Sequence, residues 1–519
     1  MDIVLREYKG HLCGDFLSEK TCERLLKLHE MQARGMALEQ VRHSIYDLSE
    51  EDVDKIIKTK TTLDSKPLGT LTDLQTLGVG YMAMAKRVLL GDSVGMGKTP
   101  QSAGLIQYLK QKTPKFRFIY FTEKKLVEKD HKELIRFTGD YIHKLTGDSS
   151  FLKKEMPKYS EEELPYSFVA SHSVIKSSIF QEWVLVYMKK YKKFPFDLII
   201  IDEASAVATT SEKSEYYKSA KALCDKCDRV VLLNATPFES RLESFRLQLT
   251  LVDPTFLPKK TEFKKRFQKT RFNGEYLEYL DEYKNAEAFK EAIKLRFLSR
   301  KRKETGGTMT NCQAKLIVVD KSPTQRRLEK LTSIPQMVYD CPSALDRTVK
   351  MTINTTPKLK TILDLVENQG KDEKTILIYC RYKESQDGII ETLEGAGYSC
   401  RKLNGETKDA DRIEIVEDFK RGKYKILVTN VQKGLNFGNC NMTIFYSALP
   451  NPNQMVQVEG RMTRDYHIEN KSIFVLATKG REQRTLQEVI AGRAKASEDF
   501  AGSDFSLVLE LLRNNSDSK

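Results

Sequence analysis

The sequence has few of the features that mark membrane or secreted proteins. No apolar run in its 519 residues reaches the roughly 18–20 residues that a membrane-spanning helix needs. Residues 1–9 lack the basic and then apolar pattern of a secretory signal peptide. The nine cysteines are scattered, which is typical of a reducing compartment. We therefore expect an intracellular protein that does not cross a membrane.

Repeats and clustered metal ligands are also scarce. The sequence has no fixed-period repeat and no long low-complexity tract, which argues against a solenoid. Only Cys224 and Cys227 lie close together, and no second close pair follows them. They would make half of a zinc site at most, so we do not expect zinc.

The charge balance favours a polyanionic partner. The net charge is +14 and the pI is near 9.1. Basic residues are spread widely along the chain, so a generally basic surface is the alternative. Charge by itself therefore suggests nucleic acid without establishing it.

The alternation of short apolar stretches with helical patterns predicts an α/β fold with two parallel-sheet lobes. We expect a helical accessory domain at residues 1–68, a first lobe at 69–255, a helical insert or connector at 256–312, a second lobe at 313–490, and a C-terminal helix and tail at 491–519. The candidate strands are residues 88–90, 117–121, 167–170, 197–201 and 229–233 in the first lobe, and residues 314–319, 375–379, 399–403, 425–428, 442–446 and 472–476 in the second.

Residues 91–99 read Gly-Asp-Ser-Val-Gly-Met-Gly-Lys-Thr and predict a phosphate-binding loop after the first strand. The backbone of Gly95, Met96 and Gly97 would approach the phosphates, Lys98 would supply charge, and the Thr99 hydroxyl would bind Mg²⁺. The loop departs from the strict spacing, because an aspartate stands six positions before the lysine where glycine is usual. We expect ATP and Mg²⁺ as cofactors.

An acidic pair follows another predicted strand. Four apolar residues, 198–201, lead into Asp202 and Glu203. Asp202 would hold Mg²⁺, and Glu203 would position the attacking water. A surface acidic pair or a helix cap is the alternative, but the preceding apolar run would bury such a pair at a cost.

The second lobe has no phosphate loop, but it carries a basic motif. Gln457 begins the sequence Gln-Val-Glu-Gly-Arg-Met-Thr-Arg, which places Arg461 and Arg464 on one helical face. Two guanidinium groups would stabilise the charge that spreads over the γ-phosphoryl oxygens during hydrolysis. A solvated helix face is the alternative.

Taken together, these segments resemble the motifs of a superfamily 2 helicase or translocase of the Swi/Snf-like branch, over roughly residues 69–490. In this branch an aspartate also stands six positions before the lysine of motif I. The further matching segments are Leu74–Val79 with Gln75 (the adenine-reading glutamine motif), Leu233–Pro237 (motif III), Leu377–Cys380 (motif IV), Leu403–Gly405 with Arg412 (the segment after it), and Val428–Asn436 with Gly434 (motif V).

The resemblance implies two RecA-like lobes with ATP between them and nucleic acid across both. Thr122, Ser171, Tyr379 and Thr429 fall in motifs that face the nucleic-acid backbone in relatives. For each of these four residues taken alone, a purely structural role is favoured over contact with nucleic acid.

Two departures favour DNA over RNA as the partner. Residues 120–125 lack the proline-threonine-arginine signature of RNA helicases, and motif III reads Asn-Ala-Thr-Pro. We expect a compact, ATP-dependent DNA helicase or translocase that remodels forked or branched DNA in replication, recombination or repair. An RNA helicase and an ATP-gated nucleic-acid clamp remain alternatives. The compact form suggests a bacterial or phage protein in the cytoplasm, or a nuclear one if the source is eukaryotic.

Overall fold

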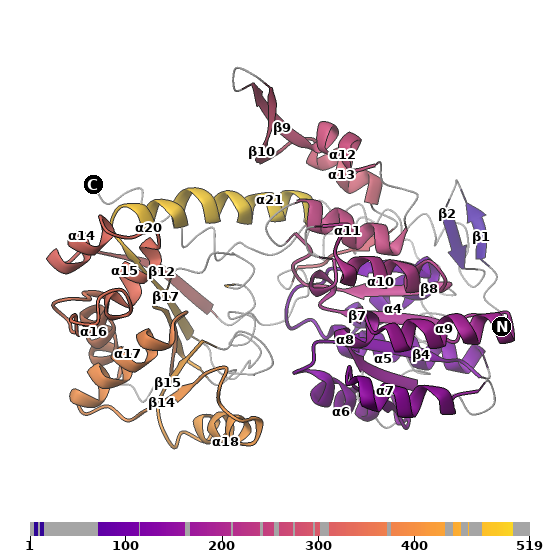
Figure 1. Ribbon diagram of the computed structural model, residues 1–519, viewed down its shortest axis with the longest axis horizontal. Coiled ribbons are helices and arrows are strands. Elements are labelled where there is room, and N and C mark those ends of the chain that lie inside the picture. Colours follow the sequence, from indigo (N-terminus) through magenta and orange to yellow (C-terminus); the bar gives the residue numbers. More distant parts are fainter. Residues whose placement is uncertain are drawn as a thin grey trace. The chain divides into compact units, whose positions relative to one another are not determined.

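The computed structural model of the chain contains two compact units, each with its own parallel sheet (Figure 1). The first unit comprises Met1–Gly307 and Ala496–Ser503, and the second comprises Thr308–Lys495 and Asp504–Lys519. The residues whose structure is described are 5–8, 11–14, 71–113, 115–160, 167–208, 211–238, 242–253, 259–272, 276–293, 296–301, 311–370, 375–430, 440–447, 455 and 470–501.

The first unit is built on a seven-stranded parallel sheet, in the order β11-β3-β8-β7-β4-β6-β5. Its strands are β3 (Arg87–Leu90), β4 (Phe118–Thr122), β5 (His143–Leu145), β6 (Ser167–Ser171), β7 (Leu198–Asp202), β8 (Arg229–Leu233) and β11 (Phe297–Leu298). The five predicted strands are confirmed within one residue at each end. The sequence did not predict β5 and β11, because two or three residues are too short to show a pattern.

Helices cover both faces of this sheet. They are α4 (Asp73–Ala85), α5 (Lys98–Lys112), α6 (Val127–Thr138), α7 (Ser149–Glu155), α8 (His172–Ile175), α9 (Ser178–Tyr191), α10 (Glu215–Cys224) and α11 (Leu242–Val252). Within β4, Ile119 and Phe121 belong to one buried core, and Phe118 and Tyr120 belong to another. Strands buried on both faces explain why each one reads as a continuous apolar run.

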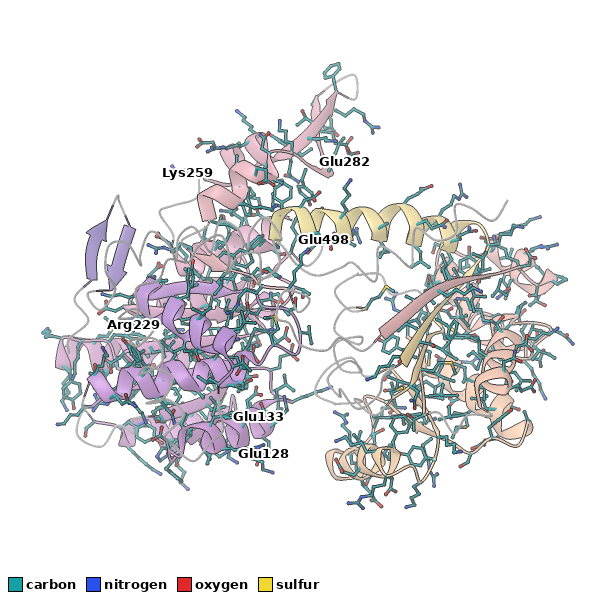
Figure 2. The ribbon with its side chains drawn as sticks, turned by 180° about the vertical axis from the view of Figure 1, so that it is seen from behind. Glu128, Glu133, Arg229, Lys259, Glu282 and Glu498 are labelled. Atoms are coloured by element: carbon teal, nitrogen blue, oxygen red, sulfur yellow. The ribbon has the colours of Figure 1, made fainter. Side chains whose placement is uncertain are left out.

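The insert that was expected to be helical also contains a β-hairpin. It consists of α12 (Lys260–Phe267), β9 (Gln268–Phe272), β10 (Leu277–Tyr283) and α13 (Ala286–Ile293). The two strands are antiparallel, and Lys269 pairs with Glu282, which Figure 2 labels on the hairpin. Aromatic residues and opposite charges across the strands favour this pairing over a helix.

The two ends of the chain also contribute to the first unit. Within the predicted accessory domain the structure describes only β1 (Leu5–Tyr8) and β2 (His11–Gly14), which are antiparallel. The helices expected in residues 1–68 lie outside the described residues. The predicted C-terminal helix is α21 (Ala491–Ala501), whose Phe500 packs against Phe238 and Phe289. No helix in the described part of the chain is long and apolar enough to span a membrane.

The second unit has a six-stranded parallel sheet, in the order β12-β17-β16-β13-β15-β14. Its strands are β12 (Asn311–Val319), β13 (Ile376–Tyr379), β14 (Cys400–Leu403), β15 (Ile426–Thr429), β16 (Met442–Phe445) and β17 (Asn470–Thr478). Its helices are α14 (Pro323–Glu329), α15 (Pro335–Asp340), α16 (Lys358–Gly370), α17 (Lys383–Gly395), α18 (Asp409–Lys420) and α20 (Arg481–Arg484). The two α/β parallel-sheet lobes expected from the sequence are therefore confirmed.

A buried lysine joins several elements of the second unit. Lys358 Nζ lies 2.8 Å from a carboxylate oxygen of Asp340 and 2.8 Å from one of Glu482, and it donates to the Tyr446 carbonyl at 3.0 Å. All three charged side chains are almost inaccessible to solvent. Removing one partner from such a group leaves uncompensated buried charge.

Replacing Lys358 with methionine should lower the free energy of unfolding of the second unit by about 3–5 kcal/mol, because Asp340 and Glu482 lose their cation. The single tryptophan, Trp183, lies in α9 and reports on the first unit. Urea denaturation of the variant should shift the circular dichroism transition but not the tryptophan fluorescence transition.

The matched control is Lys383→Met, which breaks an exposed pair with Glu406 and should leave both transitions in place. Equal changes in the free energy of unfolding for Lys358→Met and Lys383→Met would show that the buried ion pairs of Lys358 stabilise the unit no more than an exposed pair does.

Candidate nucleotide site

Polar residues gather at the carboxyl edge of the first sheet. Each lies at the end of a strand or just after one: Asp92 comes two residues after β3, Thr122 ends β4, Ser171 ends β6, Asp202 ends β7, and Asn234 follows β8. These strands are neighbours and parallel, so their ends meet at one edge.

The phosphate loop has the backbone shape that its glycines allow. Gly95 and Gly97 have φ values of 88° and 74°, which strain other residues. A Cβ atom at Gly97 would also clash with the side-chain amide of Gln75. Helix α5 begins directly after the loop, at Lys98, so the free N–H groups of its first turn face the loop.

Gln75 lies against this loop, as a residue of the nucleotide site should. Its Nε2 donates to the Met96 carbonyl at 3.2 Å. Its Oε1 accepts from the backbone N–H of Thr72 at 3.0 Å, within the capping box that starts α4. The residue therefore caps a helix and also touches the loop, so its structural and functional roles are compatible.

Lys98 is held within the loop itself. Its ammonium donates to the Asp92 carbonyl at 2.7 Å and to the Ser93 carbonyl at 3.4 Å. Phosphate oxygens are stronger acceptors than these carbonyls, so the ammonium can exchange partners when a triphosphate arrives. The loop, Lys98 and Gln75 together fit ATP.

Glu203 has a strained backbone. Its φ and ψ are 48° and 52°, the left-handed region that non-glycine residues seldom adopt. This conformation costs on the order of 1–3 kcal/mol, and such strain concentrates at functional sites. The Glu203 N–H donates to Asp202 Oδ1 at 3.0 Å, and the His172 ring lies 2.8 Å from the Asp202 carbonyl. The surroundings thus fix the orientation of the acidic pair.

The electrostatics of Asp202 suit a divalent cation. Its pKa is raised to about 8, chiefly by burial and also by the neighbouring carboxylates of Asp130 and Glu203, while Lys98 opposes them. The fully buried hydroxyl of Tyr120 lacks a well-aligned hydrogen bond, although Thr99 and Asp202 both lie close enough to affect its pKa.

These oxygen donors fit Mg²⁺ that is shared with nucleotide phosphates. Within the described residues no group of three or more His, Cys, Asp or Glu side chains could hold a metal by itself. Cys224 and Cys227 are buried thiols whose pKa values burial raises to about 12.

Asp130 is a buried acid that sequence reasoning missed. It lies on α6, and its Oδ2 accepts from Thr122 Oγ1 at 2.6 Å. Burial raises its pKa to about 6, and the negative charges of Glu133 and Glu203 contribute in the same direction. Asp130 therefore connects the end of β4 electrostatically to the acidic pair. No short motif marks it, because its partners come from other elements.

Another missed residue is Gln248 on α11, which supports motif III. Asn234 Nδ2 donates to Gln248 Oε1 at 2.8 Å, and Gln248 Nε2 donates to the Pro237 carbonyl at 2.8 Å. The Thr236 N–H donates to Asn234 Oδ1 at 3.0 Å. The loop after β8 is therefore held rigidly next to the acidic pair.

The four candidate nucleic-acid contacts are all buried at strand ends. Thr122 donates to Asp130, Ser171 Oγ lies 2.7 Å from Ser173 Oγ, and Tyr379 Oη donates to the Asn430 carbonyl at 3.4 Å. Thr429 is fully buried opposite Tyr379. These side chains support the loops that follow the strands, and contact of those loops with nucleic acid stays a prediction.

Several predicted residues of the second lobe lie outside the described residues. They are Gly434, Gln457, Arg461 and Arg464, and their roles stay predictions. Arg412 is described and buried, and its guanidinium donates to the Asn404 and Thr407 carbonyls at 3.4 and 3.3 Å. It holds the loop after β14.

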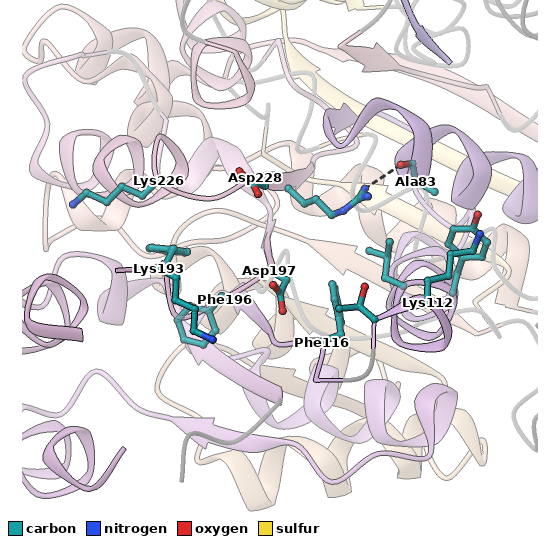
Figure 3. Close-up of a pocket in the computed structure, with 13 residues that line it drawn as sticks. Ala83, Lys112, Phe116, Lys193, Phe196, Asp197, Lys226 and Asp228 are labelled. Atoms are coloured by element: carbon teal, nitrogen blue, oxygen red, sulfur yellow. Dashed lines mark hydrogen bonds between the residues drawn. The ribbon is translucent and has the colours of Figure 1, made fainter. Parts of the chain in front are cut away.

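A pocket of about 520 Å³ lies at the opposite edge of the first sheet (Figure 3). Its lining includes Asp197, just before β7, and Arg229, the first residue of β8. Arg229 donates to the Ala83 carbonyl at 3.0 Å. The pocket is at the amino ends of the strands, so it is separate from the nucleotide site.

Comparisons with known proteins agree with this architecture. A family model described as SNF2-related domain matches residues 74–364, more than half of the chain, and one described as helicase conserved C-terminal domain matches residues 357–465. The chain is 24% identical over 475 residues to the Bos taurus SWI/SNF-related matrix-associated actin-dependent regulator of chromatin subfamily A-like protein 1, covering 87% of this chain and 46% of that protein.

Two further similarities extend over most of the chain. The uncharacterized ATP-dependent helicase YqhH of Bacillus subtilis is 23% identical over 478 residues, covering 83% of this chain and 79% of that protein. The solved Sulfolobus solfataricus SWI2/SNF2 ATPase core in complex with dsDNA matches with a TM-score of 0.41 and 18% identity, over 86% of this chain and 97% of that one. The chain spans less than half the length of the bovine relative.

Asp130 should destabilise the fold at neutral pH. Its pKa of about 6 in the folded protein exceeds the value of about 3.9 in an unfolded chain, so its ionised form opposes folding above pH 6 by roughly 3 kcal/mol. The cost fades as the pH falls towards 4. Asp130→Asn keeps the Thr122 hydrogen bond, so it should raise the free energy of unfolding at pH 8, with a gain that shrinks at pH 5.

Urea denaturation followed by Trp183 fluorescence measures this gain. The control is Asp225→Asn, which neutralises an exposed aspartate paired with Lys221 and should show no pH-dependent gain. A pH-independent effect of Asp130→Asn would contradict the raised pKa.

Proposed function

Because the chain belongs to the SNF2-related family of ATP-dependent helicases, we propose that it is a motor that couples ATP hydrolysis to movement along DNA. The observation that carries this proposal is the grouping of Gln75, the phosphate loop and the acidic pair at one edge of a parallel sheet. ATP and Mg²⁺ are the proposed cofactors.

The residues of the first unit suggest how hydrolysis would proceed. Lys98 would leave the Asp92 and Ser93 carbonyls and bind the phosphates. Thr99 and Asp202 would hold Mg²⁺, which neutralises phosphate charge when it is bound. Glu203, fixed by its strained backbone, would orient the attacking water. Arg461 and Arg464 would stabilise the charge that develops on the transferred phosphoryl group.

We propose DNA rather than RNA as the track. The Asn-Ala-Thr-Pro form of motif III and the missing proline-threonine-arginine signature support this choice. The name of the bovine relative refers to chromatin. We propose forked or branched DNA as the substrate, because the insert between the two lobes leaves limited room for a chromatin-reading module.

DNA should raise the rate of ATP turnover by at least about tenfold, which corresponds to a barrier lower by about 1.4 kcal/mol. The measurement compares single-stranded, duplex, forked and four-way DNA with matched RNA at one salt concentration. Stronger stimulation by RNA would favour an RNA helicase, and no stimulation by either would contradict the proposal. Stimulated hydrolysis without strand displacement on forks or triplexes would indicate a clamp.

Glu203→Gln should slow ATP hydrolysis by about 10²–10⁴-fold while nucleotide affinity stays close to that of the wild type, because the amide cannot polarise the water. Lys98→Ala should instead weaken nucleotide binding itself. The matched control is Glu215→Gln at the exposed start of α10, which should leave turnover unchanged. Full turnover in Glu203→Gln would remove this residue from the mechanism.

A further inference from the structure

The segment by which the chain leaves the first unit runs directly beside the phosphate loop. β11 pairs with β3, and the ladder continues beyond both strands. The Gly91 N–H donates to the Leu298 carbonyl at 2.6 Å, and the Ser93 N–H donates to the Arg300 carbonyl at 3.1 Å. Ser299 Oγ donates to the Gly91 carbonyl at 3.1 Å. The start of the loop is therefore paired with residues 298–300 along its backbone.

The Arg300 side chain joins three segments that border the nucleotide site. Its Nε donates to Asp92 Oδ1 at 2.9 Å, and its Nη2 donates to Asp92 Oδ2 and, at 2.8 Å, to Gln101 Oε1. Its Nη1 donates to the Leu74 carbonyl on α4. The side chains of Arg300 and Asp92 are only 2% and 0% exposed. The guanidinium thus bonds to the loop, to α5 and to the helix that carries Gln75.

The same network reaches the second half of the loop. Gln101 Nε2 donates to Asp92 Oδ2 at 3.0 Å and to the Met96 carbonyl at 3.4 Å. Gln75 donates to that same carbonyl, and Lys98 donates to the Asp92 carbonyl. Displacement of the Arg300 guanidinium would therefore shift the backbone carbonyls of Asp92 and Met96, which accept hydrogen bonds from Lys98 and from Gln75.

Stability by itself does not explain this arrangement. A buried ion pair adds little net stability, since the loss of hydration offsets the attraction between the charges. Glycine at position 92, as in the strict phosphate loop, would leave the guanidinium buried without its carboxylate. The aspartate and the arginine therefore complement each other, and what they fix is the shape of the loop.

We propose that Arg300 is a positioning residue that holds the phosphate loop, through Asp92 and Gln101, in the shape that receives nucleotide phosphates. The proposal rests on ATP use by this site. The next described residues after Lys301 are those of β12, in the second unit.

The first test is equilibrium binding of a fluorescent ADP analogue with Mg²⁺, without nucleic acid. Arg300→Lys keeps the charge but cannot form the forked contacts, and Asp92→Asn keeps the size of the side chain but removes its charge. Each should weaken binding by at least about tenfold, since a shift of the loop by 1 Å can cost still more. The double variant should bind about as weakly as the weaker single variant, because both changes break one network.

The matched control is Arg87→Lys, at the opposite end of β3. Arg87 also bonds to several backbone carbonyls, those of Cys224 and Leu251 among them, but it is distant from the loop along the strand. This control should lower the melting temperature to a similar extent while nucleotide affinity stays unchanged. If Arg300→Lys loses more nucleotide affinity than Arg87→Lys does, the loss comes from the position of the loop and not from lower stability of the fold.

Hydrogen exchange provides a second readout. In the wild type, nucleotide should slow exchange of the Ser93 amide, which donates to the Arg300 carbonyl, and Arg300→Lys should weaken this protection. Unchanged nucleotide affinity in folded Arg300→Lys, or in Asp92→Asn if the former does not fold, would overturn the proposal. Because no nucleic acid is present, a failure of DNA to stimulate hydrolysis would leave this result standing and affect only the proposed function.

Discussion

Parallel pairing of β3, β8, β7 and β4 is the constraint on which the nucleotide site depends. In this register Asp202 lies opposite Leu233, and Phe121 lies opposite Ile201. The loops that follow these strands therefore start at one edge, although they are far apart in the chain. Helices on both faces bury the middle of each strand, so polar residues of different strands meet at the edges of the sheet.

Carboxylates at a buried edge lose hydration, which makes their ionised forms less stable. The surroundings of Asp92, Asp130 and Asp202 offset this loss to different extents. Asp92 is paired with the guanidinium of Arg300. Asp130 accepts a hydrogen bond from Thr122, and its raised pKa reflects burial that this bond offsets only in part. Lys98 and the Glu203 N–H favour the ionised form of Asp202 but do not offset its burial, so a divalent cation is a natural partner for its charge. The charge of Asp92 is therefore paired within the chain, whereas that of Asp130 is compensated only in part.

Supporting residues come from elements outside the motifs. His172 fixes the backbone beside the acidic pair, and Gln248 holds the loop after β8. The strained backbone of Glu203 persists because such neighbours determine its position. The second unit shows the same principle in Lys358, which links strand ends and helices through buried charge. In both units, polar networks rather than apolar packing set the fine geometry of the carboxyl edge.

Local patterns in the sequence were sufficient to predict the two parallel-sheet lobes, and they suggested reactive groups whose roles stay predictions. Apolar runs predicted eleven of the strands, because a strand buried on both faces needs continuous apolar residues, and the glycine loop and acidic pair are contiguous in sequence. The hairpin of the insert was missed, because its favourable cross-strand pairs exist only once the two strands lie side by side.

Only the tertiary structure identified Arg300, Asp130 and Gln248, and only it showed that Thr122 is buried. Arg300 lies 208 positions from Asp92 in sequence, and a contact over that separation leaves no local pattern. The sequence by itself therefore determined which chemical groups the site has. The packing of distant segments decided how those groups are held, because burial and hydrogen-bond partners exist only in the folded chain.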